Sequence, residues 1–446
     1  MDFTSRLRAV VKSGPIRELT YEPDDGYRNG APLDLDRVAD SLGGRRVSTR
    51  FGECLVIDRR YEAERWHGDI RIGDCVIDDM EALALLDPSL GRAQRPALQR
   101  PCPRTVFIDL ETTGLSGGAG TLAFLVGCGY FDLGAFQVRQ FLLTSHAGER
   151  ALLAAVADFF DEADLIVTYN GKTFDVPVME TRWMFHRMEM PGIGKDGGVP
   201  HFDMLHPARR LWKNRHEAGP NRADGSQADE GGCRLSTLER TLFDVRRVGD
   251  VPGFDIPGRF FGFVRSGNPC PLEPVLEHNR IDLVSLAAVT ARAVRLTREG
   301  HESCRDCAEA LALGKVFEKA EYFARAEACF RRAAESPESV IRADALYRLG
   351  VRLRRDRRFA DAASVWRELM EFTEPRSMRR GILGDLRQVA VEALAIHHEH
   401  REKDPAGARE LALTSLDESG GTEKVRHRIA RLDRKLARRN DVQLFF

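Results

Sequence analysis

The stretch VFIDLETTGL, residues 106–115, carries the pattern that decides the fold of this chain. Its apolar and β-branched start is typical of a strand buried in a protein core. Side chains alternate along a strand, so Val106 and Ile108 should face one side of a sheet. Asp109 and Glu111 should then share the other side, where two uncompensated carboxylates are costly to bury. The pattern therefore indicates a bound cation in front of this strand.

Two later segments can supply further ligands for such a cation. YNGKTFD, residues 169–175, places Asp175 just after an apolar strand-like run, at the start of a predicted helix. LEHNRID, residues 276–282, places Asp282 on a predicted helix, one turn after His278. Hard divalent cations prefer oxygen ligands. We therefore expect these acids to converge on the first strand.

The three segments, in this order, resemble the motifs of the DEDD (DnaQ-like) 3′→5′ exonuclease superfamily. A wider arrangement resembles the YprB/MrfB-like bacterial exonucleases: CRLSTLE at 233–239, Asp-Val-Pro-Gly at 250–253, and HNRID at 278–282 before a repeat tail. The resemblance covers most of the chain and is weakest over residues 1–100 and the last hundred. It implies an α/β, ribonuclease-H-like fold with a mixed five-stranded sheet flanked by helices.

The resemblance also implies phosphodiester hydrolysis with two Mg²⁺ or Mn²⁺ ions. By motif position, Asp109 would bridge both ions. Glu111 and Asp282 would hold the ion that activates water, and Asp175 would hold the other. After the first strand, the backbone of Thr112, Thr113 and Gly114 would meet the terminal nucleotide, and Leu115 would wedge against the last base. In the second motif, Asn170 and Lys172 would contact phosphate or sugar.

His278 is the candidate general base, although its spacing is unusual. Three residues separate it from Asp282, which is the spacing of the Tyr-type branch, whereas the His-type branch shows four. Positions i and i+4 share a helix face, so His278 can lie beside Asp282 and reach a metal-bound water. Imidazoles titrate near neutral pH and suit this proton transfer. The alternative is a hydrogen bond to a backbone carbonyl.

Composition shifts divide the chain into four predicted parts. Residues 1–87 hold short strand-like runs such as ECLVIDRRY and form an N-terminal strand-bearing module. Residues 88–104 contain four prolines and form a linker. Residues 105–300 alternate strand and helix signals and form the exonuclease domain. Residues 301–446 are helical throughout.

The C-terminal part contains an internal repeat. Gly-x11-Ala-x3-aromatic occurs twice with a step of 36 residues, at Gly314, Ala326 and Phe330 and again at Gly350, Ala362 and Trp366. A weaker third copy lies around 390–413. The pattern resembles tetratricopeptide (TPR) repeats, in which paired helices pack closely and bind a protein partner. A plain helical bundle is the alternative.

Two features near the C-terminus concern partners. KVRHRIARLDRKLARR, residues 424–439, holds eight Lys and Arg and a helical apolar stripe. The basic face could follow a phosphate backbone or could simply be solvated. The final QLFF, residues 443–446, partly resembles peptides that dock into the bacterial sliding clamp; a tail that packs on the repeats is the alternative.

Composition excludes some classes of protein. With a formal net charge of −1 over 446 residues, the chain lacks the overall basic field of many nucleic-acid binders. No apolar run approaches the roughly 18 residues of a membrane span. Nine cysteines, an odd number, suit a reducing cytoplasm rather than a disulfide framework. We therefore expect a cytoplasmic protein with no membrane partner.

The resemblance indicates DNA as the substrate, in repair, beside a partner helicase. The residues alone do not separate DNA from RNA, so an RNA exonuclease is an alternative. The other alternative is a non-catalytic adaptor, in which the nuclease fold only grips nucleic acid and the repeats bind protein.

Overall fold

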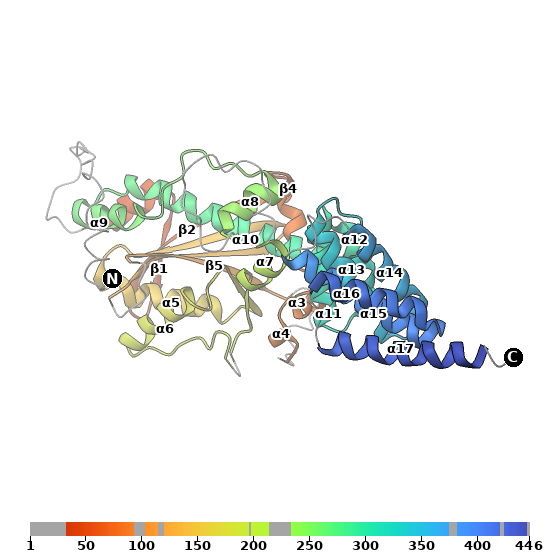
Figure 1. The fold of residues 1–446 in the computed structure, drawn as a ribbon. Helices are drawn as coiled ribbons and strands as arrows, with labels where there is room; N and C mark the ends of the chain where they lie inside the picture. Colours follow the sequence, from red (N-terminus) through yellow and green to blue (C-terminus); the bar gives the residue numbers. More distant parts are fainter. Residues whose placement is uncertain are drawn as a thin grey trace, which may run out of the picture.

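The computed structural model describes residues 33–92, 103–114, 120–195, 198–213, 233–373, 381–419 and 423–443. Figure 1 shows an α/β part that carries the central sheet and, beside it, an all-helical arm that ends in α17. The predicted α/β class with a C-terminal helical region is confirmed.

The central sheet contains seven strands within the described residues, in the order β1-β2-β7-β6-β5-β8-β9. Their bounds are Arg45–Thr49 (β1), Gly52–Glu62 (β2), Thr105–Thr112 (β5), Ala123–Asp132 (β6), Ala135–Leu142 (β7), Leu165–Thr168 (β8) and His201–Asp203 (β9). β5 pairs antiparallel with β6 and parallel with β8, so the sheet is mixed as predicted. Five of these strands, β7, β6, β5, β8 and β9 in spatial order, correspond to the five expected from the sequence.

The N-terminal strands extend this sheet. β2 pairs antiparallel with the outer edge of β7, and β1 pairs with β2. β3 (Trp66–His67) and β4 (Ile70–Arg71) form a separate small hairpin. Helix α2 (Leu35–Leu42) precedes these strands, and η1 (Ile72–Cys75), α3 (Met80–Leu86) and α4 (Pro88–Arg92) follow them. The first two strands of the N-terminal module are therefore continuous with the predicted exonuclease sheet.

Helices lie on both sides of the sheet (Figure 1). One side packs on α5 (Glu149–Phe160) and α6 (Asp175–Phe185), and the other on α7 (Leu205–Trp212), α8 (Leu235–Phe243) and the long α10 (Glu273–Glu299). Along β5, Val106 and Ile108 lie in the first core, whereas Phe107 lies in the second. The alternation predicted for this strand is confirmed, and it turns the next odd-numbered positions toward α10.

The helical arm consists of antiparallel pairs. Its helices α11 to α17 have the bounds Cys307–Lys319, Phe323–Ala334, Ser339–Arg355, Phe359–Phe372, Gly381–His397, Pro405–Ser419 and Glu423–Gln443. A Cβ at Gly314 would lie 2.6 Å from the ring of Phe330, and one at Gly350 would lie 2.7 Å from Trp366. Both glycines therefore permit the close helix pairing that the repeat predicts. The assignment to TPR repeats stays a prediction.

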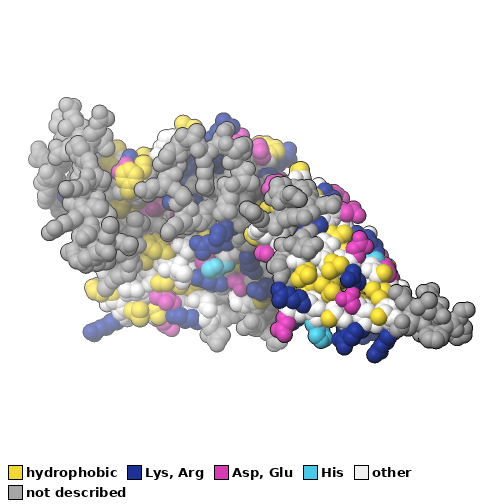
Figure 2. All heavy atoms as spheres, in the orientation of Figure 1, with side chains coloured by type: hydrophobic (Ala, Val, Ile, Leu, Met, Phe, Trp, Pro, Cys, Tyr) yellow, Lys and Arg dark blue, Asp and Glu magenta, His cyan; other side chains and the backbone are white. Residues whose placement is uncertain are grey.

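The last helix has the two faces that its sequence predicts. Val425 and Leu432 of α17 are buried against the arm. Arg431 on the same helix pairs with the buried Glu399 at 2.6 Å. Figure 2 shows Lys and Arg side chains along the edge of the arm that α17 forms. Leu444–Phe446, most of the predicted clamp peptide, lie outside the described residues.

One buried carboxylate joins the arm to the sheet domain. Glu309 of α11 accepts hydrogen bonds from Trp212 Nε1 at 2.8 Å and from Arg292 at 2.7 Å. These partners belong to α7 and α10, and one apolar core runs from these helices into the arm. Separating this buried carboxylate from its partners would leave an uncompensated charge and cost much free energy. The arm is therefore firmly attached to the domain.

No helix in the described ranges is long and apolar enough to cross a membrane.

Candidate active site

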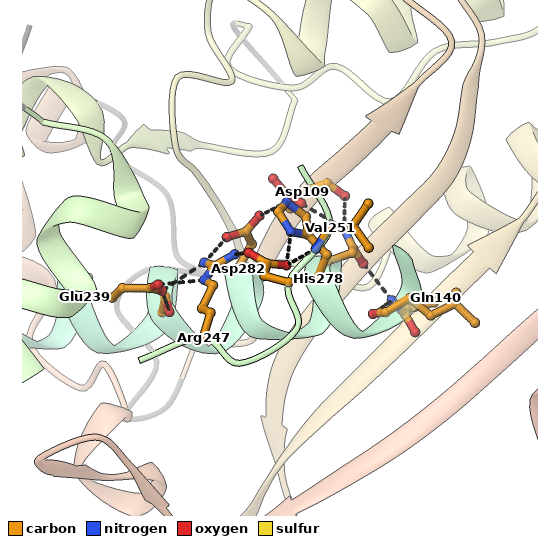
Figure 3. A network of polar contacts seen from close by, with 11 residues as sticks. Asp109, Gln140, Glu239, Arg247, Val251, His278 and Asp282 are labelled. Atoms are coloured by element: carbon orange, nitrogen blue, oxygen red, sulfur yellow. Dashed lines mark hydrogen bonds and ion pairs between the residues drawn. The ribbon is translucent and has the colours of Figure 1, made fainter. Parts of the chain in front are cut away.

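The C-terminal half of β5 meets the N-terminal part of α10, and this junction forms the centre of the candidate site (Figure 3). Asn279 of α10 donates from Nδ2 to Asp109 Oδ2 at 2.8 Å and to the Asp109 carbonyl at 3.2 Å. Gly127 of β6 lies opposite Asp109, and a Cβ there would lie 2.1 Å from Asn279 Oδ1. The sheet therefore needs glycine at this position for α10 to approach the acid.

A buried amide holds Asn279 in this orientation. Gln140 of β7 is fully buried and donates from Nε2 to Asn279 Oδ1 at 2.8 Å and to the Leu276 carbonyl at 2.9 Å. Because Asn279 Oδ1 accepts from Gln140, its amide group must face Asp109 as a donor. The amide pair therefore fixes one oxygen of the central carboxylate.

The four predicted acids share one electrostatic environment. Burial first, and then the charges of Asp282, Glu111 and Asp175, raise the pKa of Asp109 well above its ordinary value. Burial, Asp282 and Asp175 raise the pKa of Glu111 in the same way. Mutual repulsion of this kind requires proximity. The structure therefore brings these four side chains, from three segments far apart in sequence, to one place.

The second-motif acid lies at the N-terminus of α6, after a loop that Asp203 organises. Burial and the nearby charge of Asp203 raise the pKa of Asp175 to about 7. Asp203 accepts backbone N–H groups from Asn170 at 2.8 Å and Lys172 at 3.0 Å. Asn170 itself has φ of 69°, the left-handed conformation that asparagine tolerates. Asp203 thus shapes the loop that delivers Asp175.

The donor set suits a hard divalent cation. No three His, Cys, Asp or Glu side chains within the described ranges are already arranged around a single ion position. Several acids with raised pKa values are, however, buried together here. A bound cation would offset both the repulsion between their charges and the cost of desolvating them. Four carboxylates, without thiolate, favour Mg²⁺ or Mn²⁺ over Zn²⁺. The residues therefore fit the predicted ions.

His278 lies beside Asp282, as its spacing predicts. Its Nδ1 lies 2.6 Å from Asp250 Oδ1, and its Nε2 lies 3.3 Å from Asp282 Oδ2. Asp250 is in turn held by the Val251 N–H at 2.9 Å. Burial alone would raise the pKa of Asp250, but the hydrogen bond with His278 and nearby positive charges hold it below its ordinary value. An ionised Asp250 orients the ring so that Nε2 faces Asp282.

An arginine missed by the sequence analysis also enters the site. Arg247 follows α8 and donates to Asp282 Oδ1 at 2.5 Å and to Asp250 Oδ2 at 3.2 Å (Figure 3). It also donates two hydrogen bonds, of 2.6 and 2.9 Å, to the carboxylate of the buried Glu239. Its partners Glu239 and Asp250 lie in the CRLSTLE and Asp-Val-Pro-Gly segments. These two segments are the part of the sequence that could have indicated a role for Arg247.

Two comparisons place this chain in a known family. The family model described as the RNase H superfamily matches residues 106–294, which run from β5 through most of α10 and include all four acids. The chain is also 32% identical over 340 residues to the uncharacterized protein YprB of Bacillus subtilis (strain 168), and the match covers 74% of each chain. The chain belongs to the RNase H superfamily. Membership supports nuclease activity on a nucleic acid, with divalent metals.

A solved structure was also found. The family B DNA polymerase from the hyperthermophilic archaeon Pyrobaculum calidifontis matches with 14% identity and a TM-score of 0.31, over 49% of this chain and 29% of the polymerase chain. At this TM-score the likeness adds nothing to the argument for an RNase H superfamily nuclease.

The predicted substrate contacts are partly engaged within the protein. The Thr113 N–H donates to the Leu122 carbonyl at 3.0 Å, so this donor is already used. The Thr112 hydroxyl donates to the Gly114 carbonyl at 2.9 Å. The Lys172 ammonium group pairs with Asp87 at 2.8 Å. Leu115 lies outside the described residues. The nucleotide contacts of this RNase H superfamily member remain predictions.

Metal binding should depend on pH through the buried acids. Unfolded carboxyl groups titrate near pH 4. The folded, metal-free protein keeps protons on Asp175 up to about pH 7, and on Asp109 and Glu111 well above their ordinary range. The free energy of unfolding should therefore fall as pH rises from about 4 through 7. Metal must displace these protons, so the rise in Tm caused by Mn²⁺ should be larger at pH 8 than at pH 5.5.

Differential scanning calorimetry with and without Mn²⁺ at the two pH values measures this difference. A rise in Tm that is equal at pH 5.5 and pH 8 would contradict the assignment of these acids as ligands.

Proposed function

We propose that this chain is a metal-dependent 3′→5′ exonuclease of the DEDD type that hydrolyses the phosphodiester bonds of nucleic acid. The observation that supports the proposal most is the mutual electrostatic effect of Asp109, Glu111 and Asp175, together with Asp282, at the junction of β5 and α10. A fold that only gripped nucleic acid would have no use for buried carboxylates, which repel phosphate.

The acids have distinct roles in this proposal. Two bound Mg²⁺ or Mn²⁺ ions would supply an activated water and neutralise charge on the scissile phosphate. Asp109 would contact both ions, while Asn279 holds one of its oxygens at 2.8 Å. The remaining ligands are Glu111 and Asp282 for the ion that binds water, and Asp175 for the other.

His278 would act as the general base. Its Nε2 faces Asp282, where the attacking water would lie, and takes a proton from that water. Asp250 accepts the Nδ1–H and keeps the ring from turning. The proton then leaves to solvent, since the His278 side chain is 18% exposed.

The substrate and the partners are assigned from the resemblance. We propose DNA as the substrate, in repair, beside a partner helicase. The helical arm would bind a protein partner, and residues 443–446 would contact a sliding clamp. The basic face of α17 is a further candidate contact for the phosphate backbone.

An end-labelled nuclease assay tests the activity. Single-stranded DNA, double-stranded DNA and RNA of one sequence, labelled at the 5′ end, are incubated with the protein and Mn²⁺. We expect a ladder that shortens from the 3′ end with release of mononucleotides, and no cleavage when the 3′ terminus carries an inverted nucleotide. Internal cleavage of the blocked strand would contradict an exonuclease. Faster cleavage of RNA than of DNA would identify RNA as the substrate. Binding without cleavage would identify an adaptor.

A further inference from the structure

The β3–β4 hairpin, from the N-terminal module, is docked on the helix that leads into the site. Its turn residue Gly68 has φ of 57°, and a Cβ there would lie 2.0 Å from the Phe243 carbonyl at the end of α8. The next residue, Asp69, donates its backbone N–H to the same carbonyl at 2.7 Å. The hairpin turn therefore fits α8 only with glycine at this position.

A side chain of the same hairpin reaches the buried polar network. His67 Nε2 lies 2.8 Å from the hydroxyl of Ser285 on α10, and that hydroxyl donates to Glu239 Oε2. Ser285 and Glu239 are at most 1% exposed. A carboxylate only accepts hydrogen bonds, so the single Ser285 hydrogen points to Glu239. Ser285 Oγ must then accept from His67, whose Nε2 carries the hydrogen.

Glu239 fixes Arg247 in a forked geometry. Its two oxygens accept from Arg247 Nε at 2.6 Å and from the terminal nitrogen at 2.9 Å. The same terminal nitrogen donates to Asp282 Oδ1 at 2.5 Å. A bidentate carboxylate–guanidinium pair has a defined plane and direction. The direction set by Glu239 therefore decides where the Asp282 carboxylate points.

We propose that the β3–β4 hairpin, acting through His67, Ser285 and Glu239, holds Arg247 as a positioning residue for Asp282. Arg247 occupies Oδ1 of this carboxylate, which leaves Oδ2 for the cation and for His278. The inference rests on the proposed function, because it treats Asp282 as a metal ligand. It gives the N-terminal hairpin a part in the working site.

Outer partners of metal ligands change metal affinity by about 10- to 100-fold when they are removed. We expect Arg247→Ala to weaken Mn²⁺ binding about tenfold, measured by titration calorimetry on the full chain. Arg247→Lys keeps the charge but loses the fork and should behave similarly. His67→Ala, one step further away, should weaken binding about threefold. His67→Gln should restore it, because its side-chain N–H can occupy the position of Nε2.

Asp69→Ala is the matched control, since this exposed residue of the same turn contributes its backbone N–H and keeps it in the variant. It should bind Mn²⁺ like the unchanged protein, and Tm is recorded for every variant. Tighter Mn²⁺ binding by Arg247→Ala would overturn the inference and make Arg247 a competing cation. Unchanged binding by both His67→Ala and Arg247→Lys would also overturn it.

The two proposals fail separately in these experiments. If the unchanged protein binds Mn²⁺ at the four acids but cleaves no nucleic acid, the proposed exonuclease fails, while the affinity differences among the variants still test Arg247. If the unchanged protein cleaves from 3′ ends and the variants bind metal normally, only the positioning role is lost.

Discussion

An Asp109→Ala protein is expected to lose metal-dependent cleavage by about a thousandfold or more and to keep its fold. Asp109 lies among the other three acids, and all three contribute to its raised pKa. Its removal would take away the oxygens that contact both ions. The rate of mononucleotide release at saturating Mn²⁺ measures the loss, with Asp158→Ala as a control, because that acid is exposed on α5.

The isosteric Asp109→Asn variant separates the function of this residue from its effect on stability. It removes a buried charge but can still accept the hydrogen bond from Asn279. In the absence of metal we expect an equal or higher Tm than that of the unchanged protein at pH 8, because the raised pKa makes the ionised acid destabilising there. Near-normal cleavage by either Asp109 variant would remove the proposed chemistry.

His278→Ala is expected to lower the rate of cleavage at saturating Mn²⁺ by about 10²- to 10⁴-fold, the usual contribution of a general base. The loss should appear in kcat, with little change in Mn²⁺ affinity, because His278 is proposed to move a proton rather than hold the metal.

His206→Ala provides the control for this experiment, since His206 is exposed on α7. Asp250→Asn should give an intermediate rate, because it weakens the hydrogen bond that orients the ring. Turnover of His278→Ala close to that of the unchanged protein would leave the histidine with a structural role only.

The fold could be predicted where local pattern and tertiary packing agree. In β5 the alternation of Val106, Phe107 and Ile108 gave the correct faces, because each face packs on a different core. α9 (Ile256–Ser266) was not predicted. Its sequence, IPGRFFGFVRS, includes two glycines, which weaken a helix. The helix is held by tertiary contact, with Phe260 stacked on Phe124 at 4.3 Å between ring centroids.

The site was predictable only in part, for a related reason. The acidic motifs can be recognised in the sequence, because two carboxylates in a buried strand require compensation. Amides and arginines that support them carry no local signature. Asn279 acts on Asp109 across 170 residues of sequence, and Gln140 acts on Asn279 across 139. Arg247 reaches Asp282 from 35 residues away. Such partners become visible only when the fold has brought the segments together.

Anomalous diffraction from crystals soaked in Mn²⁺ shows whether the four acids bind metal. We expect manganese peaks bounded by the carboxylates of Asp109, Glu111, Asp175 and Asp282, and their absence in Asp109→Ala crystals soaked in the same way. Manganese bound elsewhere, with these four side chains free of metal at saturating concentration, would contradict this expectation.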